Sequence, residues 1–276
     1  MHTGHRPNAK GPPLRPGVLP PFRDLALAWS LIVLIAALAW LLTVDQARGM
    51  GVGPGTMGMA LPLFLVLWPA MMAAMMLPSV APVAVTWARG IARTSGGAVR
   101  ALRTTAFLSG YLVAWTAFGL VAYGGLALTG GLVDRDPDAG KWIGVAAFAL
   151  AGLYQLGPLK DICLRHCRSP MAQLMRYASY RPRLRDLRVG LHHGAYCVGC
   201  CWALMVLLIP LGVMNLAAMA GVAVLIFLEK LWSRGPQLAR VAGLVFLVLA
   251  VLAPFQDWLL PGLQDSMTPT TPMTPM

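Results

Sequence analysis

Seven stretches of mainly apolar residues, separated by short polar or basic segments, follow one another along the chain. A helix needs about 20 apolar residues to cross the hydrocarbon core of a bilayer, and most of the stretches reach or approach that length. Pro210 and Gly212 separate the fifth stretch from the sixth, because both residue types end helices. The pattern predicts an all-α fold, a polytopic transmembrane helical bundle of about seven spans, at residues 25–44, 56–87, 104–128, 141–157, 191–211, 213–231 and 236–254.

The two ends of the chain differ in composition from the part between them. Residues 1–23 are rich in proline, glycine and basic residues, and residues 261–276 are rich in proline, methionine and threonine. Neither end has an apolar period, so we predict two disordered tails around a single transmembrane helical domain at residues 24–260. The first apolar stretch is longer than a signal-peptide core and no A-x-A cleavage pattern follows it, which favours a retained span.

The basic residues predict an orientation. If the spans alternate and the N-terminus lies inside, the inner segments hold 19 of the 22 Lys and Arg residues. The positive-inside rule therefore places the N-terminus inside and, with seven spans, the C-terminus outside. With 58% apolar and 12% charged residues, the chain falls outside the composition of soluble proteins. The net charge of +12 is then a topological signal that suits an anionic bilayer, and we expect no nucleic-acid partner.

All five cysteines and three of the five histidines lie near the predicted inner face, on two consecutive hydrophobic segments, and His193 is the histidine whose spacing matches the cysteines. Helical spacing of four residues aligns two cysteines on the first segment, and aligns the histidine with two more on the second. The fifth cysteine lies one turn further, on a neighbouring edge. Thiolates and imidazoles that converge there would bind Cu(I) or Zn²⁺, although free cysteines also pack as small apolar groups. The candidate metal ligands are Cys163, Cys167, His193, Cys197, Cys200 and Cys201.

Four methionines form two i, i+4 pairs in the second apolar stretch, so they lie on adjacent faces of one helix. They are Met71, Met72, Met75 and Met76. Thioethers are soft ligands that suit Cu(I), and we count these four among the candidate metal ligands. Methionine is also a flexible filler of apolar cores, so packing is the competing interpretation.

A charged pair, Glu229 and Lys230, closes the sixth apolar stretch. Charged side chains at the end of a span can reach the water layer along their apolar stems. We therefore expect this pair to serve as a helix cap or an ion pair at the inner surface.

Four segments resemble a family of bacterial proteins described as predicted metal-binding integral membrane proteins and sometimes labelled copper chaperones. They are WPAMMAAMMLPS (68–79), YQLGPLKDICLRHCRSP (154–170), GLHHGAYCVGCCWALM (190–205) and GVMNLAAMAGVAVLIFLEK (212–230). The resemblance implies a multi-pass protein of the bacterial inner (cytoplasmic) membrane with a role in metal handling. It implies no catalytic residue.

Three hypotheses follow. In the first, the protein binds a soft metal, copper above all, and acts in its transfer, delivery or homeostasis, with a copper-dependent membrane enzyme or a soluble copper carrier as partner. In the second, it is a membrane thiol–disulfide oxidoreductase that uses the C-x-x-C formed by Cys197 and Cys200. In the third, it is a non-catalytic assembly subunit with structural thiols. An enzyme is less favoured, and no phosphate-binding loop indicates ATP-driven pumping.

Overall fold

The computed structural model describes residues 22–49, 53–92, 95–136, 138–169, 175, 177 and 184–263. Within these residues all regular structure is helical, which confirms the predicted all-α fold. Most of both predicted tails, residues 1–21 and 264–276, lies outside the described residues, so the predicted domain boundaries stay predictions.

The helices follow the predicted apolar stretches in order. Their bounds are α1 Phe22–Gly49, α2 Leu61–Ala92, α3 Gly97–Val133, α4 Ala139–Leu156, α5 Pro158–Cys167, α7 Arg185–Val206, α8 Leu208–Leu211, α9 Leu216–Leu231 and α10 Gly235–Leu252, before two short 3₁₀ turns at Ala253–Phe255 and Asp257–Leu259. The predicted break between the fifth and sixth stretches is present, because α8 ends at Leu211 and Gly212 has a φ of 93°. Only glycine takes that backbone conformation without strain.

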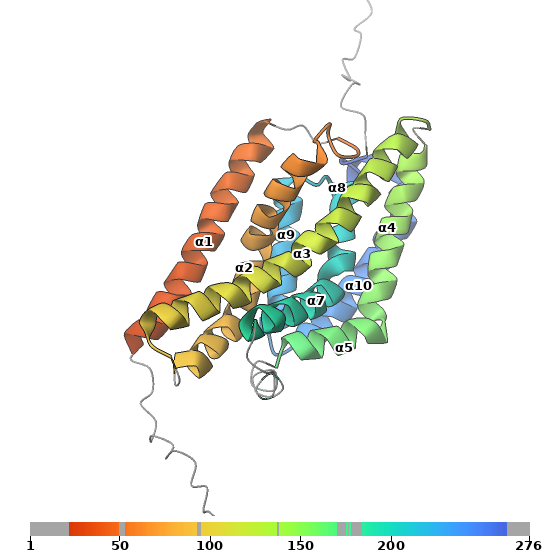
Figure 1. The fold of residues 1–276 in the computed structure, drawn as a ribbon. Helices are drawn as coiled ribbons and strands as arrows, with labels where there is room; N and C mark the ends of the chain where they lie inside the picture. The colour runs from red at the N-terminus through yellow and green to blue at the C-terminus, as the bar shows by residue number, and fades with distance from the viewer. Residues whose placement is uncertain are drawn as a thin grey trace, which may run out of the picture.

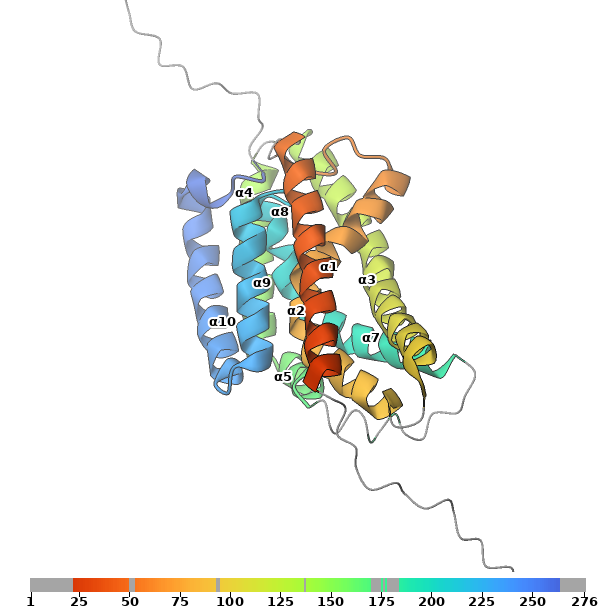
Figure 2. The ribbon, with the colours of Figure 1, turned by 90° about the vertical axis from the view of Figure 1, so that its left-hand side faces the viewer.

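Within the described part of the chain, five helices are long and apolar enough to cross a membrane: α1, α2, α3, α7 and α10, the last with the turn that follows it. The pair α4 and α5, which meet at an angle of 66°, could supply a sixth crossing. The remaining predicted span coincides with α9, which has 16 residues. Successive long helices run in alternating directions (Figures 1 and 2), as the predicted topology requires. The count of seven spans and the orientation in the membrane stay predictions.

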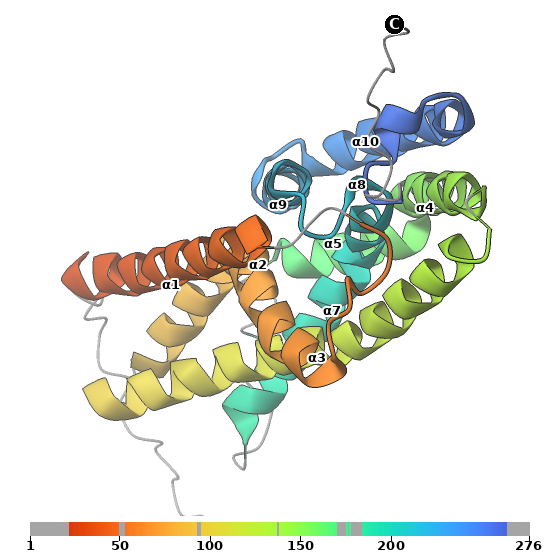
Figure 3. The same ribbon diagram turned by 90° about the horizontal axis from the view of Figure 1, so that it is seen from above.

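Seen from above, α7 begins beyond α3 and crosses it towards α8, so its later part lies between α1, α2 and α3 on one side and α4, α9 and α10 on the other (Figure 3). The most extensive helix contacts are between α3 and α7, between α4 and α10, and between α1 and α2. A side chain at Gly190 of α7 would collide with the backbone carbonyl of Phe107 in α3. Glycine at this position therefore lets the two helices approach closely, as small residues do in membrane bundles.

Two helix features bring polar groups to the centre of the bundle. The chain bends at Gly157, and Pro158 begins α5, which crosses the foot of the bundle below α7 in Figure 1. On the other side, α2 contains three prolines within its length and passes beside α9. The middle of α7 therefore meets side chains from α5, α2 and α9.

Candidate metal centre

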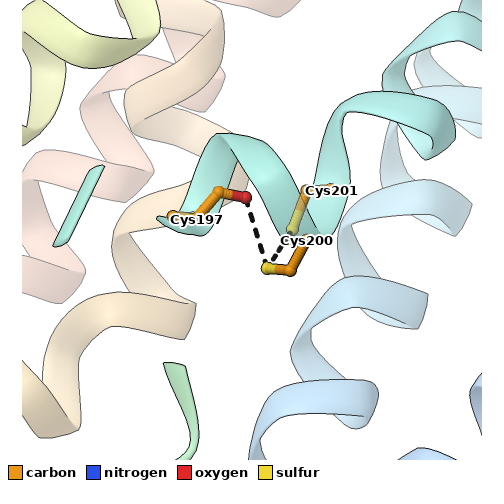
Figure 4. Close-up of side chains that lie close together, drawn as sticks. All are labelled: Cys197, Cys200 and Cys201. Atoms are coloured by element: carbon orange, nitrogen blue, oxygen red, sulfur yellow. Dashed lines mark hydrogen bonds between the residues drawn. The ribbon is translucent and has the colours of Figure 1, made fainter. Parts of the chain in front are cut away.

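Three cysteines of one helical turn form a buried sulfur group in α7 (Figure 4). Cys197, Cys200 and Cys201 have side chains that are at most 1% exposed. Their Sγ atoms all lie within 4.8 Å of one another, and Cys200 and Cys201 are separated by 3.2 Å between sulfurs. The spacing i, i+3 and i+4 puts the three Cβ atoms on one side of the helix. We call these three residues the sulfur group.

The two cysteines of α5 lie differently with respect to that group. The Sγ atom of Cys167 is 3.7 Å from that of Cys200, so the two predicted cysteine segments meet at this contact. Cys163 is only partly buried, and its sulfur lies against Gly199, where a Cβ would be 3.0 Å from it. Cys167 thus extends the sulfur group from a second helix, whereas Cys163 packs beside the backbone of α7.

His193 lies one turn before Cys197 and is 2% exposed. Its ring stacks on those of Phe107 and Tyr111, at centroid distances of 6.2 and 6.0 Å. Among the described residues its Nδ1 atom has no hydrogen-bond partner, which is rare for a buried polar atom. His193 does not belong to the group of ligand atoms within 4.8 Å of one another, so the structure places this predicted ligand beside the sulfur group rather than in it.

The four predicted methionine ligands lie on α2 and are packed in the core of the helical bundle, each at most 2% exposed. One turn further along α2, Ser79 donates a hydrogen bond to the carbonyl of Met76 and accepts one from Lys230. Lys230 in turn contacts the sulfur group through Cys197. Met71, Met72, Met75 and Met76 thus line the part of α2 that leads to the site.

The expectation that Glu229 and Lys230 reach water is wrong. Glu229 is 1% exposed and Lys230 is 7% exposed, because this face of α9 packs against α2, α5 and α7. Glu229 accepts hydrogen bonds from Lys160 Nζ at 2.6 Å and from Gln155 Nε2 at 2.5 Å. The Lys160 ammonium also donates to the carbonyl oxygen of Cys200 at 2.7 Å, so this ion pair supports the backbone of the sulfur group.

Lys230 contacts the sulfur group itself. Its Nζ atom lies 2.9 Å from Cys197 Sγ, and the hydroxyl of Tyr111 lies 3.0 Å from the same sulfur. An ammonium next to a sulfur favours the thiolate form, which is the form that binds metals. Sequence reasoning missed Lys230 and Tyr111 as parts of the site. The signal for Lys230 was present, because an ionisable residue inside an apolar stretch is a functional candidate by default.

A second polar group lies on the α5 side of His193. The rings of His166 and Tyr196 stack at 3.8 Å, and the Tyr177 hydroxyl lies 2.6 Å from His192 Nδ1 and 3.2 Å from His166 Nε2. A phenol therefore pairs with one ring nitrogen of each of these two imidazoles. This second group contains no sulfur, so the soft ligands of the site are the cysteine sulfurs.

The chain also matches a known protein family. The pattern of the PpoB2 family, described as copper chaperone, matches residues 65–253. The chain belongs to this family. The matched segment includes the cysteines, His193, the methionines of α2 and the three buried charged residues, and the resemblance inferred from the sequence is confirmed. No curated protein and no solved structure matches the chain.

Proposed function

We propose that the protein binds Cu(I) as cargo through the sulfur group and transfers it to a partner, as an integral protein of the bacterial inner membrane. The observation that carries the proposal is the buried sulfur group, whose Sγ atoms lie within 4.8 Å of one another. Cys167 supports it from α5, and the description of the family names copper. Soft thiolate ligands suit Cu(I) and Zn²⁺ better than hard cations such as Mg²⁺ and Ca²⁺.

Zinc is the second candidate metal. Structural zinc sites are almost always closed by four ligands in a tetrahedron. The sulfur group supplies three, and Cys167 is close only to Cys200. Cu(I) needs fewer ligands, so the number of close sulfurs favours copper over zinc.

The proposed route of the ion uses the methionines of α2. Met71, Met72, Met75 and Met76 would offer weaker thioether ligands on the way to the stronger thiolates. The support is their place in α2, which reaches Lys230 and the sulfur group through Ser79. We propose that a copper-dependent membrane enzyme or a soluble copper carrier exchanges the ion with this site.

A thiol–disulfide oxidoreductase has less support. Reactive cysteines normally lie in partly exposed positions, because the attacking sulfur has to reach another disulfide. Cys197 and Cys200 are 0 and 1% exposed, which disfavours exchange with a substrate protein. A non-catalytic assembly subunit would not need an ammonium directed at a cysteine sulfur, as Lys230 is directed at Cys197.

The test is metal analysis of protein purified in detergent under reducing conditions after loading with Cu(I). The double variant Cys197→Ser with Cys201→Ser removes two sulfurs of the group, and we expect it to lose the bound copper. Cys163→Ser is the matched control, because the same chemical change is made in a thiol outside the group. Equal copper in the double variant and the wild type would refute the proposed site.

A further inference from the structure

Buried charged side chains surround the sulfur group. Among the described residues, the buried side chains with a formal charge are Lys160, Glu229 and Lys230. Glu229 holds Lys160 with a 2.6 Å ion pair, and its second oxygen accepts the amide of Gln155. Lys160 and Glu229 therefore neutralise each other, and one positive charge remains.

That remaining charge is the ammonium of Lys230. Its hydrogen-bond partners are Ser79 Oγ at 3.2 Å and Cys197 Sγ at 2.9 Å. The hydroxyl of Ser79 donates its own proton to the carbonyl of Met76, so it can offer Lys230 only a neutral lone pair. A buried ion without an opposite charge is costly, by several kcal/mol even after relaxation. The negative charge that balances the Lys230 ammonium must therefore come from the sulfur group.

The charge of a metal–sulfur complex depends on the number of sulfurs bound, since each binds as a thiolate. Cu(I) held by two thiolates carries a charge of −1, and Cu(I) held by three carries −2. A divalent ion such as Zn²⁺ held by three thiolates also carries −1. A complex of −1 neutralises Lys230, whereas a complex of −2 leaves a buried negative charge.

We infer that Lys230 sets the number of ligands: its ammonium limits Cu(I) to two of the three sulfurs in the group, with Cys197 as one of them. This inference rests on the proposed function, because it concerns the same site and the same ion. The spacing of the sulfurs alone would allow a third ligand, since all three lie within 4.8 Å of one another. Cu(I) binds two sulfurs because of the buried charge of Lys230, and not because a third sulfur lies too far away.

Two variants separate the charge of Lys230 from its bulk. Lys230→Met keeps the length and removes the charge, and replacing a buried ion by an apolar residue is often neutral for stability or stabilising. Lys230→Arg keeps the charge at nearly the same reach. A third variant, Lys141→Met, is the matched control, because it makes the same change in an exposed lysine at the start of α4 that pairs with Asp138.

The affinity for Cu(I) is measured by competition with a chromophoric Cu(I) chelator on detergent-purified protein. X-ray absorption on the loaded protein gives the number of sulfurs per copper. We expect two sulfurs in the wild type, at least a tenfold weaker affinity in Lys230→Met, and recovery to within about threefold in Lys230→Arg. We expect Lys141→Met to keep two sulfurs and the wild-type affinity.

The outcomes distinguish this inference from the proposed function. If the wild type binds no Cu(I), or still binds it after Cys197→Ser with Cys201→Ser, the proposed function fails. If copper binds at the sulfurs but Lys230→Met has the wild-type affinity, the role of Lys230 alone is refuted. Three sulfurs per copper in the wild type, or equal losses in Lys230→Met and Lys230→Arg, would also overturn it.

Discussion

The two sides of the sulfur group each contain a buried lysine, but they neutralise it in different ways. On the α5 side, Lys160 meets a carboxylate at 2.6 Å and a backbone carbonyl at 2.7 Å, which completes its charge balance within the protein. On the α2 side, Lys230 meets a neutral hydroxyl and a cysteine sulfur. Lys160 therefore belongs to the scaffold, whereas the charge of Lys230 has to be balanced by the sulfur group and the metal ion it binds.

The largest effect is expected on the α5 side. Glu229→Ala leaves the Lys160 ammonium buried without an opposite charge, which should lower the free energy of unfolding by about 3–5 kcal/mol. Thermal unfolding in detergent, followed by circular dichroism, measures the change. Lys160→Met with Glu229→Gln removes both charges and should stay near the wild type. A single variant as stable as this double variant would show that Lys160 and Glu229 are not a tight pair.

Cu(I) should stabilise the folded protein through the α2 side. At a free concentration one hundred times the dissociation constant, binding to the folded state adds about 2.7 kcal/mol. The gain should persist in Lys160→Met with Glu229→Gln and disappear in Cys197→Ser with Cys201→Ser. Unfolding at buffered Cu(I) concentrations checks this. The same gain in the cysteine double variant would place the bound ion elsewhere.

Removing the sulfur that faces Lys230 should matter even without metal. In Cys197→Ala the ammonium retains Ser79 as its hydrogen-bond partner and loses its charged one, so we expect a loss of about 2 kcal/mol in the metal-free protein. Cys201→Ala is the control, because it shortens a buried cysteine whose sulfur is not bonded to Lys230, and should cost about 1 kcal/mol. Equal losses in a denaturant titration would argue against a special pairing of Cys197.

The smallest effect on stability is expected for the methionines of α2. Met72→Leu with Met76→Leu conserves volume and should cost less than about 1.5 kcal/mol at each position. Copper content at equilibrium should not change, because the sulfur group is intact. Cu(I) loading, followed in a stopped-flow chelator assay, should be slower if the thioethers form the route. An unchanged rate would leave these residues a packing role only.

Much of the fold could be predicted from the apolar pattern, because each apolar stretch coincides with helix in the structure. The ends of the helices were harder to place. The third stretch, predicted at 104–128, belongs to a helix that runs from Gly97 to Val133, because a segment with two arginines extends it at the start and a segment with two glycines extends it at the end. The break between α7 and α8 follows Val206, one turn before Pro210, because Pro210 has no N–H to bond the Val206 carbonyl and its ring crowds that carbonyl.

The candidate site could be predicted only where local spacing decides it. Cys197, Cys200 and Cys201 share one turn of α7, so their proximity follows from helical geometry alone. The exclusion of Cys163 depends on how α5 turns at Gly157, which spacing within α5 does not specify. The burial of Glu229 and Lys230 required knowledge of which helices pack around the end of α9, and a single sequence does not contain that information directly.

The three sulfurs lie on one turn of one helix, while the ammonium beside them comes from α9. A rigid shift of α7 against α9 would therefore move the positive charge away from the sulfurs without altering the distances among them. Hold and release of an ion could then be controlled by the sliding of two packed helices, with the ligand geometry itself unchanged.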